Sequence, residues 1–221
     1  MPQPSQDYRV SFGLDSNQPK ITEKALDLAL DIRKFEIGLY WQRTAYFWAL
    51  IAVAFAGFFA VQSAEHIESK SFHAFVIACI GFLFSLAWFL VNRGSKFWQE
   101  NWENHVDMLE DGLAGPLYKT ILRRPKPERF VEKWIDGPAP ISVSKINQWV
   151  SLFTVVIWVL LAVFVVGPLD VSAPISIRHL AVLAVTVVFA LLLVTKTQTH
   201  LGDHKHSVTV RRTAILDDGS V

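Results

Sequence analysis

The chain has one cysteine, Cys79, and it lies inside an apolar run. A single cysteine excludes an intramolecular disulfide, so no disulfide framework holds this fold. The net charge is only +1, which gives no case for the clustered basic surface that binds nucleic acid. The first forty residues are polar, so a cleavable secretory signal, in which an apolar stretch follows positive charges, is not expected.

Four long runs lack Asp, Glu, Lys and Arg altogether. They are residues 44–64, 71–92, 146–169 and 179–195. A helix needs about 20 apolar residues to cross the hydrocarbon core of a bilayer, and buried helices of soluble proteins seldom lack charge on every face for so long. With 52% hydrophobic residues and eight Trp, the composition agrees. We therefore predict an all-α membrane protein with four transmembrane helices.

Chemistry-bearing motifs are also scarce. We find no phosphate-binding Gly loop, nucleophile elbow or metalloprotease helix, so no catalytic residue and no bound cofactor is predicted and an enzyme is not expected. No ionisable residue lies deep in a span, which argues against an ion-coupled transporter.

Lys and Arg are distributed very unevenly between the segments that flank the spans. Residues 1–43, 93–145 and 196–221 hold nineteen, whereas the two short connectors hold one each, Lys70 and Arg178. By the positive-inside rule, both termini and the central segment are predicted to be cytoplasmic.

The first two spans are predicted to continue into the cytoplasm as a long antiparallel hairpin. Thr22 is a plausible N-cap for the first helix, and no Pro interrupts residues 79–111. The connector between the spans is short, so the helices must be neighbours. Small residues follow one face of each span, and we expect these faces to pack together. They are Ala49, Ala52 and Ala56 in the first span and Ala74, Ala78, Gly81 and Ser85 in the second.

Beyond the second span, two neighbouring helix faces stand out. One is aromatic and apolar, with Trp98, Trp102, His105 and Leu109; the other is acidic, with Glu100, Glu103, Asp107 and Asp111. We expect the aromatic face to have no partner inside one subunit, and assign Trp98, Trp102, His105, Leu109 and Glu103 to an oligomer interface.

Basic residues near the membrane surface are candidates for lipid contact. They are Arg43, Arg93, Arg123 and Arg124. Arg43 falls on one helix face with Glu36, which allows an ion pair or a headgroup contact there; an ordinary interface anchor is the default interpretation. An ordinary solvated charge run remains the alternative for the central basic segment.

The C-terminal tail carries the one cluster with metal-ligand residue types, His200, Asp203, His204 and His206. His200 and His204 share a face if the fourth helix continues, a spacing that zinc uses. A solvated tail without metal is the alternative. Minor β structure is also expected in the tails, where residues 8–12 alternate like a short strand, and alternation at 208–210 and 214–216 allows a partner strand.

The sequences EIGLYWQRTAYFWA, from Glu36, and NRGSKFWQENWENHVDMLED, from Asn92, resemble the RipA-like octameric membrane proteins of bacterial inner membranes. The resemblance covers roughly residues 30–115. It implies a homo-oligomeric ring and a link to bacterial fitness under stress or in a host, and it supplies no catalytic residues.

Three functions follow as hypotheses, with the membrane lipids and the chain itself as partners. The first is a non-enzymatic scaffold or assembly platform. The second is a cation-selective pore on the ring axis, lined by repeats of Glu100, Glu103 and Asp107. The third is a metal- or lipid-handling protein at the cytoplasmic face.

Overall fold

The computed structural model describes residues 6–15, 19–122, 129–167, 176–199 and 201–202. Its elements are α1 (Gln6–Ser11), α2 (Pro19–Ser63), α3 (Lys70–Leu109), the short π-helix η1 (Glu132–Asp136), α4 (Val143–Val166) and α5 (Ile177–Thr195). The described residues contain no strand, and α2, α3, α4 and α5 are each long and apolar enough to span a membrane. The all-α membrane fold with a long first hairpin is therefore confirmed.

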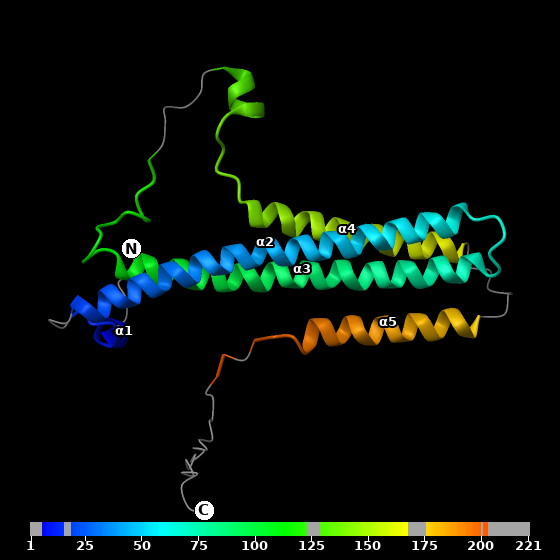
Figure 1. Cartoon of the computed structure of the whole chain (residues 1–221), viewed down its shortest axis with the longest axis horizontal. Helices are drawn as coiled ribbons and strands as arrows, with labels where there is room; N and C mark the ends of the chain where they lie inside the picture. Colours follow the sequence, from blue (N-terminus) through cyan, green and yellow to red (C-terminus); the bar gives the residue numbers. More distant parts are fainter. Residues whose placement is uncertain (1–5, 16–18, 123–128, 168–175, 200, 203–221) are drawn as a thin grey trace, which may run out of the picture.

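Helices α2 and α3 lie side by side over nearly their whole length (Figure 1). At 1.5 Å per residue, the 45 residues of α2 extend about 68 Å, roughly twice the hydrocarbon thickness of a bilayer. We call residues 44–63 and 70–92 the apolar half of the hairpin, and residues 19–43 and 93–109 its polar half. When the apolar half crosses a bilayer, the polar half therefore extends beyond that bilayer.

Helix α3 is the centre of the bundle, because α2, α4 and α5 all contact it. Helix α4 begins at the N-cap Ser142, whose side chain accepts a hydrogen bond from the Lys145 amide, and ends at Gly167 with a φ of 74°. Helix α5 buries only Thr186. Most of its other side chains are exposed in the single chain, whereas His179 packs against Phe72 and Phe75 of α3.

Two sequence predictions about the N-terminal region are wrong. Residues 8–12, predicted as a strand, lie in and just after the helix α1. Thr22 is not the N-cap of α2, which begins three residues earlier at Pro19. The Thr22 hydroxyl instead donates a hydrogen bond of 2.8 Å to the Phe12 carbonyl and so holds α1 against α2. The predicted partner strand, residues 208–216, lies outside the described residues.

Candidate functional site

The small residues of α3 form the packing face of the apolar half. Ala74, Ala78, Gly81 and Ser85 are all buried. An ideal Cβ on Gly81 would lie 2.2 Å from Trp158 Cε2, so the Trp158 ring of α4 rests directly on the α3 backbone. The same ring stacks on Phe55 of α2, with centroids 4.2 Å apart. Because these α3 residues are small, side chains of α2 and α4 contact each other over the surface of α3.

The matching prediction for α2 is wrong, because Ala49, Ala52 and Ala56 are exposed and point away from α3. The buried face of α2 in this half consists of Thr44, Ile51, Ala54 and Phe58. Helix α2 is thus rotated so that its larger side chains fill the space above the small residues of α3. The alanine stripe is left on the lipid-facing surface of the single chain.

A buried polar layer marks the boundary between the two halves. The Asn147 side-chain amide of α4 donates a hydrogen bond of 2.8 Å to the Tyr40 hydroxyl of α2. The Asn92 amide of α3 lies 3.4 Å from both the Asn147 carbonyl oxygen and Ser151 Oγ. Because buried amides need partners, this layer sets the register of three helices.

The predicted lipid residues Arg43 and Arg93 lie at the same boundary. Arg43 Nη1 lies 3.7 Å from Glu36 Oε2, which is the predicted pair, and it donates a 3.1 Å hydrogen bond to Ser95 of α3. The Arg93 guanidinium lies over the Phe89 ring, 5.8 Å from its centroid. Arg123 and Arg124 lie outside the described residues.

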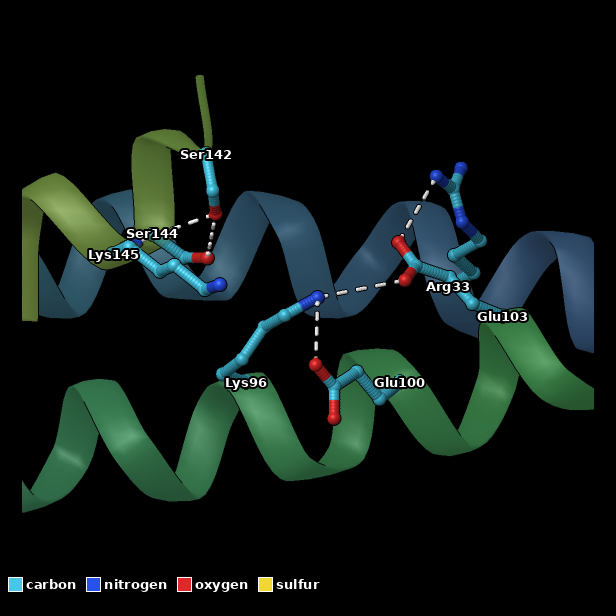
Figure 2. Close-up of polar contacts among 7 residues, drawn as sticks. All are labelled: Arg33, Lys96, Glu100, Glu103, Ser142, Ser144 and Lys145. Carbon is cyan, nitrogen blue, oxygen red and sulfur yellow. Dashed lines mark hydrogen bonds and ion pairs between the residues drawn. The ribbon is translucent and has the colours of Figure 1, made fainter. Parts of the chain in front are cut away.

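An ion network ties the two helices together in the polar half (Figure 2). Arg33 Nη2 of α2 lies 3.3 Å from Glu103 Oε1 of α3, and Lys96 Nζ reaches Glu103 at 3.5 Å and Glu100 at 3.4 Å. Glu103 is thus the link between the helices. Its predicted role in an oligomer interface stays a prediction.

An aromatic cluster joins α1 to the polar half. The Tyr8 hydroxyl lies 2.9 Å from His105 Nδ1, and the His105 ring contacts those of Phe12 and Trp102. Burial lowers the pKa of His105 and raises that of Tyr8, so the neutral forms of both are favoured here.

The expectation that the aromatic face has no partner inside one subunit is therefore wrong for three of its four residues. His105 and Trp102 pack in the aromatic cluster, and Leu109 is 1% exposed among Leu26, Ala29 and Val106. Sequence reasoning missed the aromatic cluster because residues 8–12 were taken for a strand. Trp98, with 37% of its surface exposed, keeps an outward position.

Glu110 is a buried carboxylate that the sequence did not bring to notice. It is 1% exposed and accepts hydrogen bonds from the backbone amides of Tyr118, at 2.8 Å, and Lys119, at 3.2 Å. It therefore closes the turn that follows α3, and the adjacent Asp111 pairs with Lys119 Nζ at 2.6 Å.

The residues available for a metal or cofactor give no site in the described part of the chain. No group of three or more His, Cys, Asp or Glu side chains converges there. Of the predicted cluster, His200, Asp203, His204 and His206 all lie outside the described residues, so that prediction remains open.

The polar half also exposes large apolar side chains, where no lipid would cover them. Leu28 and Phe35 of α2 are 50% and 63% exposed, and Phe97 of α3 is 47% exposed. A shallow groove with a volume of about 380 Å³ lies on α2 around Gly38. Exposed apolar groups of this kind, beside polar neighbours, are typical of protein interaction surfaces.

Comparison with protein families gives one match, to a family described as the octameric membrane protein family, over residues 23–167. The match covers most of the chain, from the start of the hairpin to the end of α4. Comparisons with curated proteins and with solved structures give no match.

Proposed function

Because this chain belongs to the octameric membrane protein family, we propose that it is a non-enzymatic subunit of a ring-shaped octamer that serves as an assembly platform in the bacterial inner membrane. The polar half of the hairpin would be the working surface of the platform. As the resemblance in the sequence implies, its role would lie in adaptation to stress or to a host.

The observation that carries this proposal is the set of contacts that join α1, α2 and α3 in the polar half. The ion network around Glu103, the aromatic cluster around His105 and the apolar contacts of Leu109 hold α1, α2 and α3 together well beyond the apolar half. A stiff rod that exposes apolar side chains at its sides is suited to holding other proteins, including copies of itself, at a set height above the membrane.

The residue types best suited to catalysis have structural partners here. His105 contacts Tyr8, Glu103 bridges Arg33 and Lys96, and Glu110 accepts two backbone amides. These contacts support a structural role for the polar half. The excess of Lys and Arg on three of the flanking segments supports a cytoplasmic location for this half and for both termini.

The mass of the purified complex tests the assembly. Eight copies of the 25.0 kDa chain give about 200 kDa. Native mass spectrometry after release from lipid nanodiscs should show this species, with detergent-solubilised protein as a second preparation. A monomer in both preparations would overturn the proposal.

A cation pore on the ring axis is a second candidate, favoured by Glu100, whose side chain is 61% exposed beside Lys96. Rings of carboxylates attract cations. Planar-bilayer recordings separate the two functions: a pore should conduct cations and lose selectivity in Glu100→Ala, whereas a platform should give no conductance in either protein.

The third candidate, metal or lipid handling at the cytoplasmic face, depends on the tail cluster from His200 to His206. Elemental analysis of the purified chain, together with a His200→Ala/His204→Ala variant, tests it directly. Equal metal content and equal retained lipid in the two proteins would remove this candidate.

A further inference from the structure

We propose that neighbouring subunits of the octamer meet through two unlike surfaces of the polar half. The groove around Gly38 on α2 of one copy receives Phe97 and Trp98 of α3 from the next copy. This inference rests on the proposed octamer and identifies the surfaces that would build it.

Membrane topology restricts how copies of this chain associate. A twofold axis in the plane of the bilayer would invert half of the subunits, whereas the Lys and Arg distribution favours one orientation for all of them. The symmetry axis must then run along the membrane normal, and a closed ring about such an axis uses a different surface on each side of the subunit. The two surfaces must also lie at the same height along the axis.

The groove supplies one such surface. It is lined by residues of α2 alone: Asp31, Lys34, Phe35, Gly38, Leu39 and Gln42. A Cβ on Gly38 would meet nothing within 4 Å, so no other described element covers the groove floor. Phe35, with 63% of its surface exposed, forms an apolar wall. The groove therefore combines apolar surface, open backbone and two charged groups.

Phe97 and Trp98 supply the second surface. They are 47% and 37% exposed, and their rings contact each other edge to face with centroids 5.4 Å apart. Aromatic side chains of this size are favoured at the centres of protein interfaces, where they fill pockets on the partner. Because they follow the uncharged run that ends at Asn92, they lie beyond the lipid-covered part of α3.

The two surfaces lie at the same height. The Arg33–Glu103 ion pair and the Arg43–Ser95 hydrogen bond join α2 and α3 at two levels, above and below the groove. Gly38 is midway between Arg33 and Arg43 in the antiparallel pair, and thus level with the α3 residues midway between Ser95 and Glu103. The midway residue of α3 is Gln99, and Phe97 and Trp98 lie within about 3 Å of its level along the helix axis, as a ring about an axis along the hairpin requires.

One pair of charges on the two surfaces is complementary, Lys34 in the groove and Glu100 beside Phe97. Lys34 lies in the groove one turn from Gly38, on the side away from the apolar half. Glu100 lies in the same direction from Phe97 on α3, and its side chain is 61% exposed. When Phe97 enters the groove of the next copy, Glu100 approaches Lys34, which favours this register over a slipped one.

Disulfide crosslinking tests the contact directly. Cys79, the only native cysteine, is buried, so introduced cysteines report on the interface alone. The double variant Gly38→Cys/Phe97→Cys in nanodiscs should give, on oxidation, a ladder of covalent dimers, trimers and larger species on non-reducing gels. Each single variant should stay monomeric on the gel, because unlike surfaces bring no cysteine near its own copy.

The outcomes separate this inference from the octamer itself. A 200 kDa native mass without a ladder in the double variant would overturn the contact and leave the octamer standing. Dimers from a single variant would overturn it as well, because they indicate like surfaces in contact. A monomeric native mass would overturn the octamer and the contact together.

Filling the groove is an independent test. Gly38→Trp should weaken the octamer, so that the subunit concentration at which half of it dissociates rises by at least tenfold. The helicity measured by circular dichroism should stay unchanged, because Trp is a better helix former than Gly. Gly112→Trp is the matched control, since Gly112 is exposed with nothing within 4 Å of its Cβ position. Equal dissociation of the two variants would contradict the proposal.

Discussion

The apolar and polar halves of the α2–α3 hairpin are held together in different ways. In the apolar half, α3 presents a small-residue face, and Trp158 closes on the Gly81 backbone. In the polar half, α3 buries Val106 and Leu109 against α2 and adds ion pairs around Glu103. Lipid tails are as apolar as the side chains, so close approach stabilises the first half, whereas water drives burial of large side chains in the second. One continuous helix thus meets two solvents with two kinds of contact.

The largest effect is expected from Leu109→Ala, which removes a fully buried side chain in the water-exposed half. The loss should be about 2–5 kcal/mol, because burial energy is lost and a cavity remains. Hydrogen exchange of peptides from residues 19–43 measures the opening of this half. Leu113→Ala is the control, because Leu113 is 39% exposed; similar exchange in the two variants would contradict the assignment of Leu109 to the core.

Gly81→Ala should destabilise the apolar half by about 1–3 kcal/mol, because its Cβ overlaps the Trp158 ring and forces the helices apart. Gly57→Ala is the matched control: its Cβ would lie 3.7 Å from Ile77 Cδ1, an ordinary contact. Unfolding in mixed detergent, followed by circular dichroism, compares the two. A Gly81 variant as stable as the Gly57 variant would show that α4 does not pack as described.

Acid should loosen α1 from the polar half. The folded structure lowers the pKa of His105 below its usual 6.5, so the unfolded or undocked form binds the proton more readily. Neutral His105 therefore stabilises the docked α1 fully above the usual pKa of 6.5, and this stabilisation is lost as the pH falls below that value. Hydrogen exchange of residues 6–15 should therefore accelerate between about pH 7.5 and 5.5, after correction for intrinsic exchange.

Two variants separate the contributions to this docking. Tyr8→Phe should weaken it by about 0.5–1.5 kcal/mol at neutral pH through the lost hydrogen bond. His105→Gln should remove the acid dependence. If the corrected exchange still accelerates in acid in His105→Gln, a different group is responsible.

The smallest effect is expected from Glu103→Gln. The ion pairs with Arg33 and Lys96 are partly exposed, so their loss should cost about 0.2–1 kcal/mol and the difference should shrink at high salt. Thermal unfolding at low and high ionic strength measures it. If Glu103→Gln lost more stability than Leu109→Ala, ion pairs and not apolar burial would be the main stabilisation of the polar half.

The resemblance carried by residues 36–49 and 92–111 was confirmed by the family match, and the all-helical fold by the structure. The docking of α1 was missed because a six-residue segment is too short for a helical period to outweigh alternation of apolar residues. The hydrogen bonds of Glu110 were missed because they join it to backbone amides eight and nine residues away, which leave no mark in the side-chain pattern.

The sequence by itself determined which segments cross the membrane and that the first two form one long hairpin. Hydrocarbon thickness demands about 20 uncharged residues per span, and a six-residue connector leaves the helices no other arrangement. Only the tertiary structure decided how α2 is rotated, with Ile51 and Phe58 buried and Ala49 and Ala52 exposed. In a helix that is apolar all round, hydrophobicity cannot mark the packed face. That choice follows from shape, because Phe55 and Phe58 of α2 pack against the Trp158 ring that lies over Gly81.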